Sequence, residues 1–215
     1  MKVFILGATG ALGRTVTKLA LEKGIDVKAF VRNPAKVSVQ NSKLEIVQGN
    51  ILNETDVNNA IKGVDAVIWT IGHENKKAAK KTMAMDTCSR GSRYVINAMN
   101  THNLKRFIAV SSWGVGEDNR KRTPLFFKHF IFRFVLNKEF ADKEKQEEII
   151  RSSNTDYTII RPCRLTNSVK NCGLQVGHAL HYSHFSNTPR ALLADFILKI
   201  IRDNSFVRET VEVSC

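Results

Sequence analysis

Short apolar runs alternate along this chain with longer segments in which apolar residues recur every three or four positions. The apolar runs predict buried strands at 3–6, 27–31, 44–47, 64–71, 107–110 and 157–160. The segments with the helical period predict helices at 11–23, 54–61, 80–100, 139–152 and 189–201. Strands that alternate with helices are typical of βαβ units. We therefore expect an α/β, doubly wound Rossmann fold, with a mainly parallel sheet and helices on both faces.

A glycine-rich turn follows the first apolar run. Gly7, Gly10 and Gly13 are three residues apart, and the helical pattern starts at Ala11. In dinucleotide-binding folds the first glycine permits a tight turn and the second lets the backbone approach the pyrophosphate. The third lets the helix pack closely on the strand. N–H groups at the helix start then bind the anion. Glycines placed between a strand and a helix in this way predict a nucleotide-binding domain.

The residues after the second apolar run indicate which nucleotide is preferred. NAD sites usually carry a carboxylate there, which bonds the ribose 2′-hydroxyl. This chain has Arg32-Asn33-Pro34 instead, and a planar guanidinium suits a 2′-phosphate. We expect NADP(H) to be preferred over NAD(H), the alternative being that Arg32 is an ordinary surface residue.

The ends of the next two strands supply further candidate cofactor contacts. Gly49 and the small amide of Asn50 suit the edge of the adenine, with Ile51 beside them. The fourth strand ends at Thr70-Ile71-Gly72, and ligands of open α/β sheets bind at such carboxyl ends. Either segment could instead be only a turn that ends a strand.

Length and composition restrict the class of protein. The chain has 215 residues, enough for one α/β domain, and it shows no repeat or linker. We predict a single NAD(P)-binding Rossmann domain over 1–215, with a small cap formed by segments at about 113–138 and 166–187. The net charge of +13 suits an anionic cofactor or a small anionic or aromatic substrate. Because no recognition motif accompanies this charge, no nucleic acid is expected.

The cysteines and the N-terminus bear on the compartment. Cys88, Cys163, Cys172 and Cys215 form no CxxC pair and no disulfide-like spacing, so reduced thiols are expected. The chain begins without the apolar region of a signal peptide, and no run approaches the roughly 20 apolar residues of a membrane span. The expectation is a cytoplasmic protein, either a monomer or a homodimer.

The segment 124–136 interleaves five phenylalanines with basic residues and predicts an amphipathic helix. Its aromatic rings would pack on the domain or on a dimer partner. They could instead form a wall or lid over an aromatic substrate, and peripheral membrane attachment is the least favoured reading.

Two other groups of residues carry weaker signals. His178, His181 and His184 lie three residues apart, but no suitably spaced carboxylate or cysteine accompanies them, so no metal site is expected. Ser111 and Ser112 lack a Gly-x-Ser-x-Gly elbow, which excludes a typical serine hydrolase.

Taken in order, these motifs resemble the atypical short-chain dehydrogenase/reductase superfamily, in the group of flavin reductase/biliverdin-IXβ reductase-like proteins with NmrA-like relatives. The resemblance covers nearly the whole chain. Its landmarks are Gly7-Ala-Thr-Gly10-Ala-Leu-Gly13, Val31-Arg32-Asn33-Pro34, Gly49-Asn50-Ile51, Asp65-Ala-Val-Ile68, Val110-Ser111-Ser112 and Asp156-Tyr157-Thr-Ile-Ile-Arg161-Pro162.

The resemblance implies roles for individual residues. Thr9, Ala11 and Leu12 would line the pyrophosphate turn, and Ser111 would lie at the cofactor-facing end of the fifth strand. Ser112 would orient the nicotinamide or the acceptor. The residues after the sixth strand, Pro162, Cys163 and Leu165, would flank the nicotinamide. Cys163 is expected to be a buried wall residue, the alternative being a reactive thiol.

One departure from the superfamily affects the expected chemistry. Its dehydrogenases use Tyr-x-x-x-Lys for proton exchange, and none of Tyr94, Tyr157 or Tyr182 has a lysine four residues later. Phe134 does, at Lys138, but a phenyl ring transfers no proton. Lys143 is a candidate to reach the ribose or substrate, the alternative being a solvated helical lysine.

The resulting hypothesis is an NADPH-dependent reductase that transfers hydride to a conjugated acceptor such as a flavin, quinone or tetrapyrrole. Ser111, Ser112 and Lys143 would be its catalytic residues. The alternative is a non-catalytic NADP-binding sensor or interaction protein of the NmrA-like kind.

Overall fold

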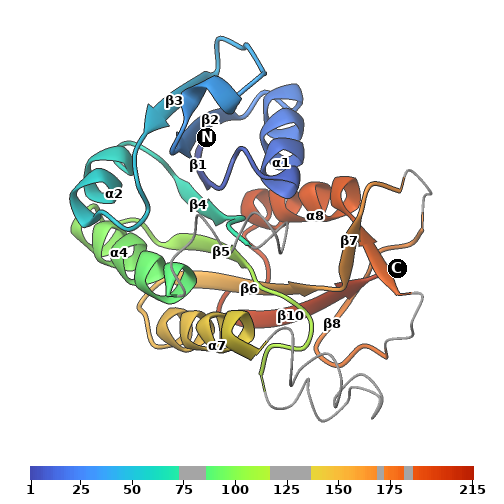
Figure 1. Cartoon of the computed structure of the whole chain (residues 1–215). Coiled ribbons are helices and arrows are strands. Elements are labelled where there is room, and N and C mark those ends of the chain that lie inside the picture. Colours follow the sequence, from blue (N-terminus) through green and yellow to red (C-terminus); the bar gives the residue numbers. More distant parts are fainter. Residues whose placement is uncertain (73–85, 117–136, 169–171, 182–185) are drawn as a thin grey trace.

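The computed structural model describes residues 1–72, 86–116, 137–168, 172–181 and 186–215, arranged around one twisted sheet (Figure 1). The sheet has eight strands in the order β3-β2-β1-β4-β5-β6-β10-β8. The strands are β1 (Lys2–Leu6), β2 (Asp26–Val31), β3 (Leu44–Gln48), β4 (Ala66–Trp69), β5 (Arg106–Val110), β6 (Asp156–Pro162), β8 (Gln175–Gly177) and β10 (Glu209–Ser214). All neighbours pair in parallel except β10 with β8. This confirms the expected doubly wound α/β fold, because the order β3-β2-β1-β4-β5-β6 is that of dinucleotide-binding sheets.

Helices cover both faces of the sheet (Figure 1). On one face, α1 (Ala11–Glu22) and α8 (Arg190–Arg202) pack against β1 through Val3 and Ile5. The other face carries α2 (Glu54–Ala60), α4 (Thr87–Thr101) and α7 (Asn137–Arg151), with Phe4 and Leu6 of β1 in that core. A strand buried on both faces needs apolar residues at every position. That requirement explains the continuous apolar runs of the sequence.

The helix expected at 139–152 is observed at Asn137–Arg151, and the one expected at 11–23 at Ala11–Glu22. The helix expected at 80–100 is observed as Thr87–Thr101, its first residues lying outside the described part of the chain. A short 3₁₀ helix, Pro34–Lys36, follows β2, where Asn33 Oδ1 accepts a hydrogen bond from the Ala35 N–H.

The C-terminal strands were not predicted from the sequence. β7 (Arg164–Thr166) and β9 (Asn187–Pro189) form a separate parallel pair, while β8 and β10 extend the main sheet. β10 carries only Val211 and Val213 into the core and has polar residues between them. Such short segments form strands because of partners distant in the sequence rather than because of their own pattern.

Part of the second expected cap segment, 166–187, forms β8 and so belongs to the main sheet. Of the first, 113–138, the structure describes 113–116 and the start of α7. The phenylalanine-rich segment 124–136 lies outside the described residues.

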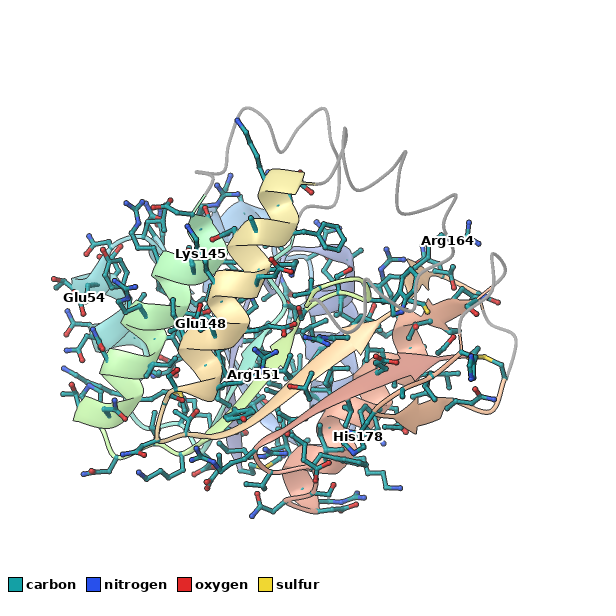
Figure 2. The ribbon with its side chains drawn as sticks, turned by 90° about the horizontal axis from the view of Figure 1, so that it is seen from below. Glu54, Lys145, Glu148, Arg151, Arg164 and His178 are labelled. Atoms are coloured by element: carbon teal, nitrogen blue, oxygen red, sulfur yellow. A yellow bond between two sulfur atoms is a disulfide. The ribbon has the colours of Figure 1, made fainter. Side chains whose placement is uncertain are left out.

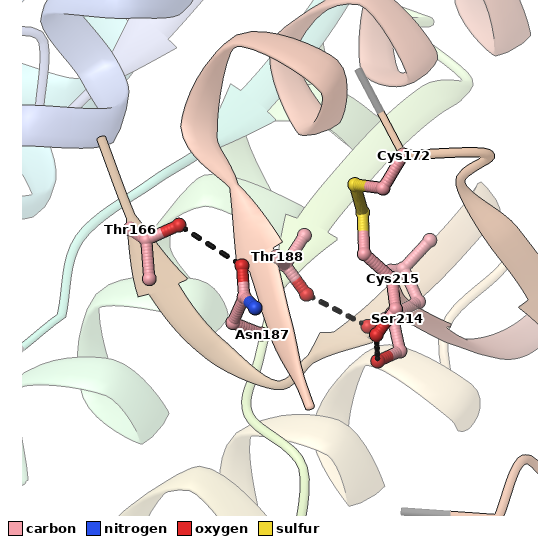
Figure 3. The surroundings of a disulfide bond; sticks show 7 residues. Thr166, Cys172, Asn187, Thr188, Ser214 and Cys215 are labelled. Carbon is pink, nitrogen blue, oxygen red and sulfur yellow. Dashed lines mark hydrogen bonds between the residues drawn. A yellow bond between two sulfur atoms is a disulfide. The ribbon is translucent and has the colours of Figure 1, made fainter. Parts of the chain in front are cut away.

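A disulfide corrects the expectation that all four cysteines are reduced thiols. Cys172 and Cys215 are bonded, with a Cα–Cα distance of 5.7 Å and a sequence separation of 43 (Figure 3). The Cys215 N–H also donates to the Asn187 carbonyl at 2.8 Å, so the end of β10 is tied to both β9 and the Cys172 loop. Spacing along the chain could not reveal this pair, because a disulfide requires proximity in the fold. Cys88 and Cys163 are buried and take no part in this disulfide.

Candidate active site

A cavity of about 370 Å³ lies at the carboxyl ends of β4, β5 and β6. Ligands of open α/β sheets bind at this edge, where the strand order reverses between β1 and β4. The cavity brings together many of the residues that the sequence singled out: Leu12, Thr70, Ile71, Gly72, Ser111, Ser112, Lys143, Pro162, Cys163 and Leu165. It also includes Trp113, Arg164 and Arg190, which the sequence did not single out.

The glycine turn between β1 and α1 borders this cavity. Gly7 has a φ of +85°, a left-handed conformation that favours glycine, and its carbonyl accepts the Gly10 N–H at 2.9 Å. A Cβ on Gly13 would lie 2.1 Å from the Gly7 carbonyl oxygen. α1 therefore starts closer to β1 than any side chain would permit. Gly10 caps the helix with no side-chain hydrogen bond, which leaves the space before the first turn to a ligand.

Thr70, at the end of β4, holds the other side of this turn. Its hydroxyl donates to the Leu6 carbonyl at 2.8 Å. The same oxygen lies 2.8 Å from where a Gly13 Cβ would be and 2.9 Å from that of Gly7. The glycine turn is thus packed between two strand ends and needs a small, hydrogen-bonded residue at Thr70.

The residues expected at the adenosine half lie away from the cavity. Arg32 is exposed at the end of β2, and Thr9 is half-buried in the glycine turn beside Ala11. The Asn50 side chain is exposed and accepts the Leu52 N–H at 3.1 Å, while the Asn50 N–H donates to Asp56.

The side chain of Ile51, the residue expected beside the adenine contact of Gly49 and Asn50, lies in the core. Ile51 is 6% exposed and belongs to the core between the sheet and α4. Its Cγ1 lies 2.8 Å from where a Cβ of Gly91 would be. An apolar side chain after a strand end is drawn into the nearest core, so only the backbone of Ile51 can face a ligand.

Lys143 is buried, which corrects the alternative of a solvated helical lysine. It is 8% exposed and lines the cavity from α7, whereas Lys138 on the same helix is exposed. With Arg164 and Arg190 it supplies positive charge, and the described lining includes no aspartate or glutamate. Arg190 donates from Nη1 to Asn167 at 2.8 Å, while its Nε is buried without a hydrogen-bond partner in the described part of the chain. An orphaned guanidinium N–H beside a cationic cavity fits an anionic ligand.

A buried polar face on α7 explains why Lys143 points inward. Asp142, Lys143, Gln146 and Glu147 are all buried, at positions that share one side of a helix. Gln146 Nε2 donates to Ser92 Oγ of α4 at 2.7 Å. The sequence analysis missed this face because its residues are polar, and helical periodicity in apolar residues was the signal used.

Asp142 caps the neighbouring helix α4. Its carboxylate accepts the N–H groups of Cys88 at 2.8 Å and of Ser89 at 3.0 Å. A carboxylate at this position also favours the positive end of the helix dipole. Burial raises the pKa of the Cys88 thiol to about 11, so Cys88 is a core residue rather than a nucleophile.

Glu147, which the sequence analysis missed, connects the end of β5 to β6. Ser111 Oγ donates to Glu147 Oε1 at 2.6 Å. Arg161 donates to both carboxylate oxygens, from Nε at 3.0 Å and from Nη2 at 2.6 Å. Arg151, one turn along α7, also donates to Oε2. A carboxylate two residues before the apolar pair Ile149-Ile150 of α7 gave no distinguishing signal in sequence.

The histidine group lies elsewhere. His178 contacts the Thr210 carbonyl at 3.1 Å and Glu209 at 3.3 Å, near the amino end of β10 and so at the opposite edge from the cavity. His184 lies outside the described residues. Within the described ranges, no cluster of three or more histidine, cysteine or acidic side chains is placed to hold a metal ion. No helix in that same part of the chain is both long and apolar enough to cross a bilayer.

Comparison with known proteins decides the family. The model of an NAD(P)H-binding family matches residues 7–204. The chain belongs to this NAD(P)H-binding family. Its sequence is 31% identical over 170 residues to the uncharacterized sugar epimerase YhfK of Bacillus subtilis, covering 78% of this chain and 73% of that one. It is 26% identical over 166 residues to the photosystem II assembly factor Ycf39 of Trieres chinensis, covering 75% of this chain and 45% of that protein.

Among solved structures, the fold is similar to that of ChuY, an anaerobilin reductase from Escherichia coli O157:H7. The TM-score is 0.81 at 20% identity, with 99% of this chain and 96% of that chain covered. This similarity confirms the Rossmann-type fold of the whole chain. Membership of the family agrees with the resemblance to atypical short-chain dehydrogenases/reductases.

Proposed function

We propose that this protein is an NADP(H)-dependent reductase that transfers hydride to a conjugated acceptor such as a flavin, quinone or tetrapyrrole. The observation that carries the proposal is the cavity beside the glycine turn, lined by Lys143, Arg164 and Arg190 without an acidic group in its described wall. A cofactor with its pyrophosphate at the start of α1 would reach this cavity along the strand ends. Bound NADPH supplies the hydride, which is the difficult part of the chemistry.

The residues of the chain would then bind and orient. Leu12, Pro162 and Leu165 offer apolar surface in the cavity, suited to flat rings. Ser111 and Ser112 lie at the end of β5 on the same wall. Lys143 would hold the anionic group of an acceptor and stabilise the negative charge that arrives with the hydride. Because the chain lacks Tyr-x-x-x-Lys, the proton would come from Lys143 or from solvent.

Oxidation of NADPH by the purified protein tests this function. We expect the NADPH absorbance to fall in the presence of at least one of FMN, riboflavin, a quinone or biliverdin, and not without an acceptor. Calorimetry with NADPH should be run beside it. Tight binding of NADPH with no oxidation by any of these acceptors would contradict the reductase and support the alternative.

That alternative is a non-catalytic NADP-binding sensor or interaction protein. The similarity to a protein named as a photosystem II assembly factor favours it. The two functions differ in what NADPH does once bound, so the absorbance assay separates them.

The preference for NADP(H) depends on Arg32. Replacing Arg32 with glutamate should weaken NADPH binding by about 10- to 100-fold, because charge-assisted hydrogen bonds to phosphate contribute about 1.5–3 kcal/mol. Binding of NADH, which has no 2′-phosphate, should change by less than about threefold. Calorimetry with both nucleotides measures the difference.

Lys18→Glu is the matched control for this substitution. Lys18 is an exposed residue of α1 that pairs with Glu22, and the variant makes the same change in net charge. It should leave both affinities unchanged. If Arg32→Glu weakened NADPH and NADH equally, the assignment of Arg32 to the 2′-phosphate would be wrong.

A further inference from the structure

Each hydroxyl group in the described cavity wall donates a hydrogen bond to another atom of the protein. Thr70 donates to the Leu6 carbonyl at 2.8 Å, and Ser112 to the Trp113 carbonyl at 3.2 Å. Ser111 donates to Glu147 Oε1 at 2.6 Å. Of the three acceptors only Glu147 is a charged side chain, and hydrogen bonds to charged groups are the strongest. Ser111 is therefore the hydroxyl whose orientation is most firmly set.

Glu147 can act only as an acceptor in this network. Its two oxygens accept one hydrogen bond from Ser111, two from Arg161 and one from Arg151. An ionised carboxylate has no proton to donate. The hydrogen of Ser111 must then point at Glu147, which leaves the lone pairs of Ser111 Oγ for the cavity.

The surroundings hold the Glu147 carboxylate in place. It is 1% exposed, and a buried carboxylate requires charged, hydrogen-bonding partners. Arg161 donates one hydrogen bond to each carboxylate oxygen of Glu147, and this bidentate geometry best fixes the orientation of a carboxylate. The loop after β5 closes over Arg161, since a Cβ on Gly116 would lie 2.6 Å from its Nη2. The Gly116 N–H is held in turn by Glu144 on α7, at 3.1 Å.

We propose that Glu147 is a positioning residue that makes Ser111 a hydrogen-bond acceptor toward the cavity. A ligand group opposite Ser111 must then carry an N–H or O–H donor. On the cofactor placement of the proposed function, on which this inference rests, that group is the carboxamide NH₂ of the nicotinamide. The site would thus recognise the amide of the cofactor through an oriented hydroxyl and reject an acceptor-only group at the same position.

The binding of two oxidised nucleotides tests this orientation without any turnover. NADP⁺ carries the carboxamide, while nicotinic acid adenine dinucleotide phosphate carries a carboxylate, which only accepts hydrogen bonds. Calorimetry should give a ratio of the two affinities for the wild-type protein. Glu147→Gln places an amide NH₂ where it can donate to Ser111, so the serine proton can turn into the cavity. The ratio of the two affinities should then shift by about tenfold in favour of nicotinic acid adenine dinucleotide phosphate, which is the effect of one hydrogen bond.

Ser111→Ala and a double variant separate positioning from general damage. Ser111→Ala removes the hydroxyl and should shift the ratio in the same direction. Adding Glu147→Gln to Ser111→Ala should cause no further shift, because Glu147 acts through the serine. Glu148→Gln is the matched control, since Glu148 is exposed on the next position of α7 and the charge change is the same; it should leave the ratio unchanged (Figure 2).

Each outcome bears on one claim. If Ser111→Ala bound the two nucleotides with the same ratio of affinities as the wild-type protein, the inference would be overturned, even if Glu147→Gln failed to fold. An equal shift from Glu147→Gln with and without Ser111 would also overturn it, since Glu147 would then act independently of the serine. If the wild-type protein bound neither nucleotide, the proposed function itself would be wrong.

Discussion

Replacement of Lys143 by methionine is expected to lower kcat/KM for an anionic acceptor by about 100-fold. The long apolar side chain of methionine replaces the apolar stem of the lysine and removes only the ammonium group. Lys143 is buried and lines the cavity, so its charge acts where water does not screen it well. Removing one preorganised charge from such a site costs about two to three powers of ten in rate. Steady-state NADPH oxidation with the preferred acceptor measures the loss.

Lys145→Met is the matched control for this prediction. Lys145 lies two residues along α7 and is exposed, in the groove between α4 and α7 rather than in the cavity (Figure 2). The substitution and the change in net charge are identical, and kcat/KM should stay within about twofold of the wild type. Equal losses in both variants would mean that the overall positive charge attracts the acceptor, and that Lys143 has no special role.

Replacement of Gly13 by alanine is expected to destabilise the fold by about 3 kcal/mol or more and to weaken NADPH binding in parallel. Alanine is the better helix former by about 1 kcal/mol, so propensity alone predicts stabilisation. The steric effect is larger, because the new Cβ would lie 2.1 Å from the Gly7 carbonyl oxygen and 2.8 Å from Thr70 Oγ1. Backbone atoms cannot move aside as a flexible side chain can, so α1 must shift away from β1.

Urea unfolding gives the change in free energy, and calorimetry gives the affinity for NADPH. Gly173→Ala is the control, since no atom of the described residues lies within 4 Å of a Cβ placed on Gly173. That variant should change the free energy of unfolding by less than about 0.5 kcal/mol. A Gly13→Ala protein as stable as the wild type would show that α1 can start farther from β1 without cost.

The regular part of the fold was predictable because its signals are local. β1 and β2 are apolar at nearly every position since both of their faces are buried, and the glycine turn has the residue spacing that its geometry requires. The position of the cavity was predictable by the same reasoning. Thr70, Ser111 and Pro162 lie at the carboxyl ends of parallel strands, and these ends must meet at one edge of the sheet.

Prediction was poorest where a residue's environment comes from distant parts of the chain. Ile51 looked like a strand-end contact and is drawn into the core beside α4. The polar residues of α7 gave no signal in the sequence and form its buried side, because Ser92, Ser111 and Arg161 supply partners for Gln146 and Glu147. Burial of a polar group depends on such partners, which no local pattern reveals.

The sequence by itself determined the class of fold, the nucleotide-binding turn and most of the cavity wall, because periodicity and glycine spacing depend on neighbours along the chain. Only the tertiary structure decided that Cys172 and Cys215 are bonded, that Lys143 faces the cavity, and that Ser111 donates to Glu147. These features depend on distances between residues far apart in sequence, and such distances exist only once the sheet and its helices have packed.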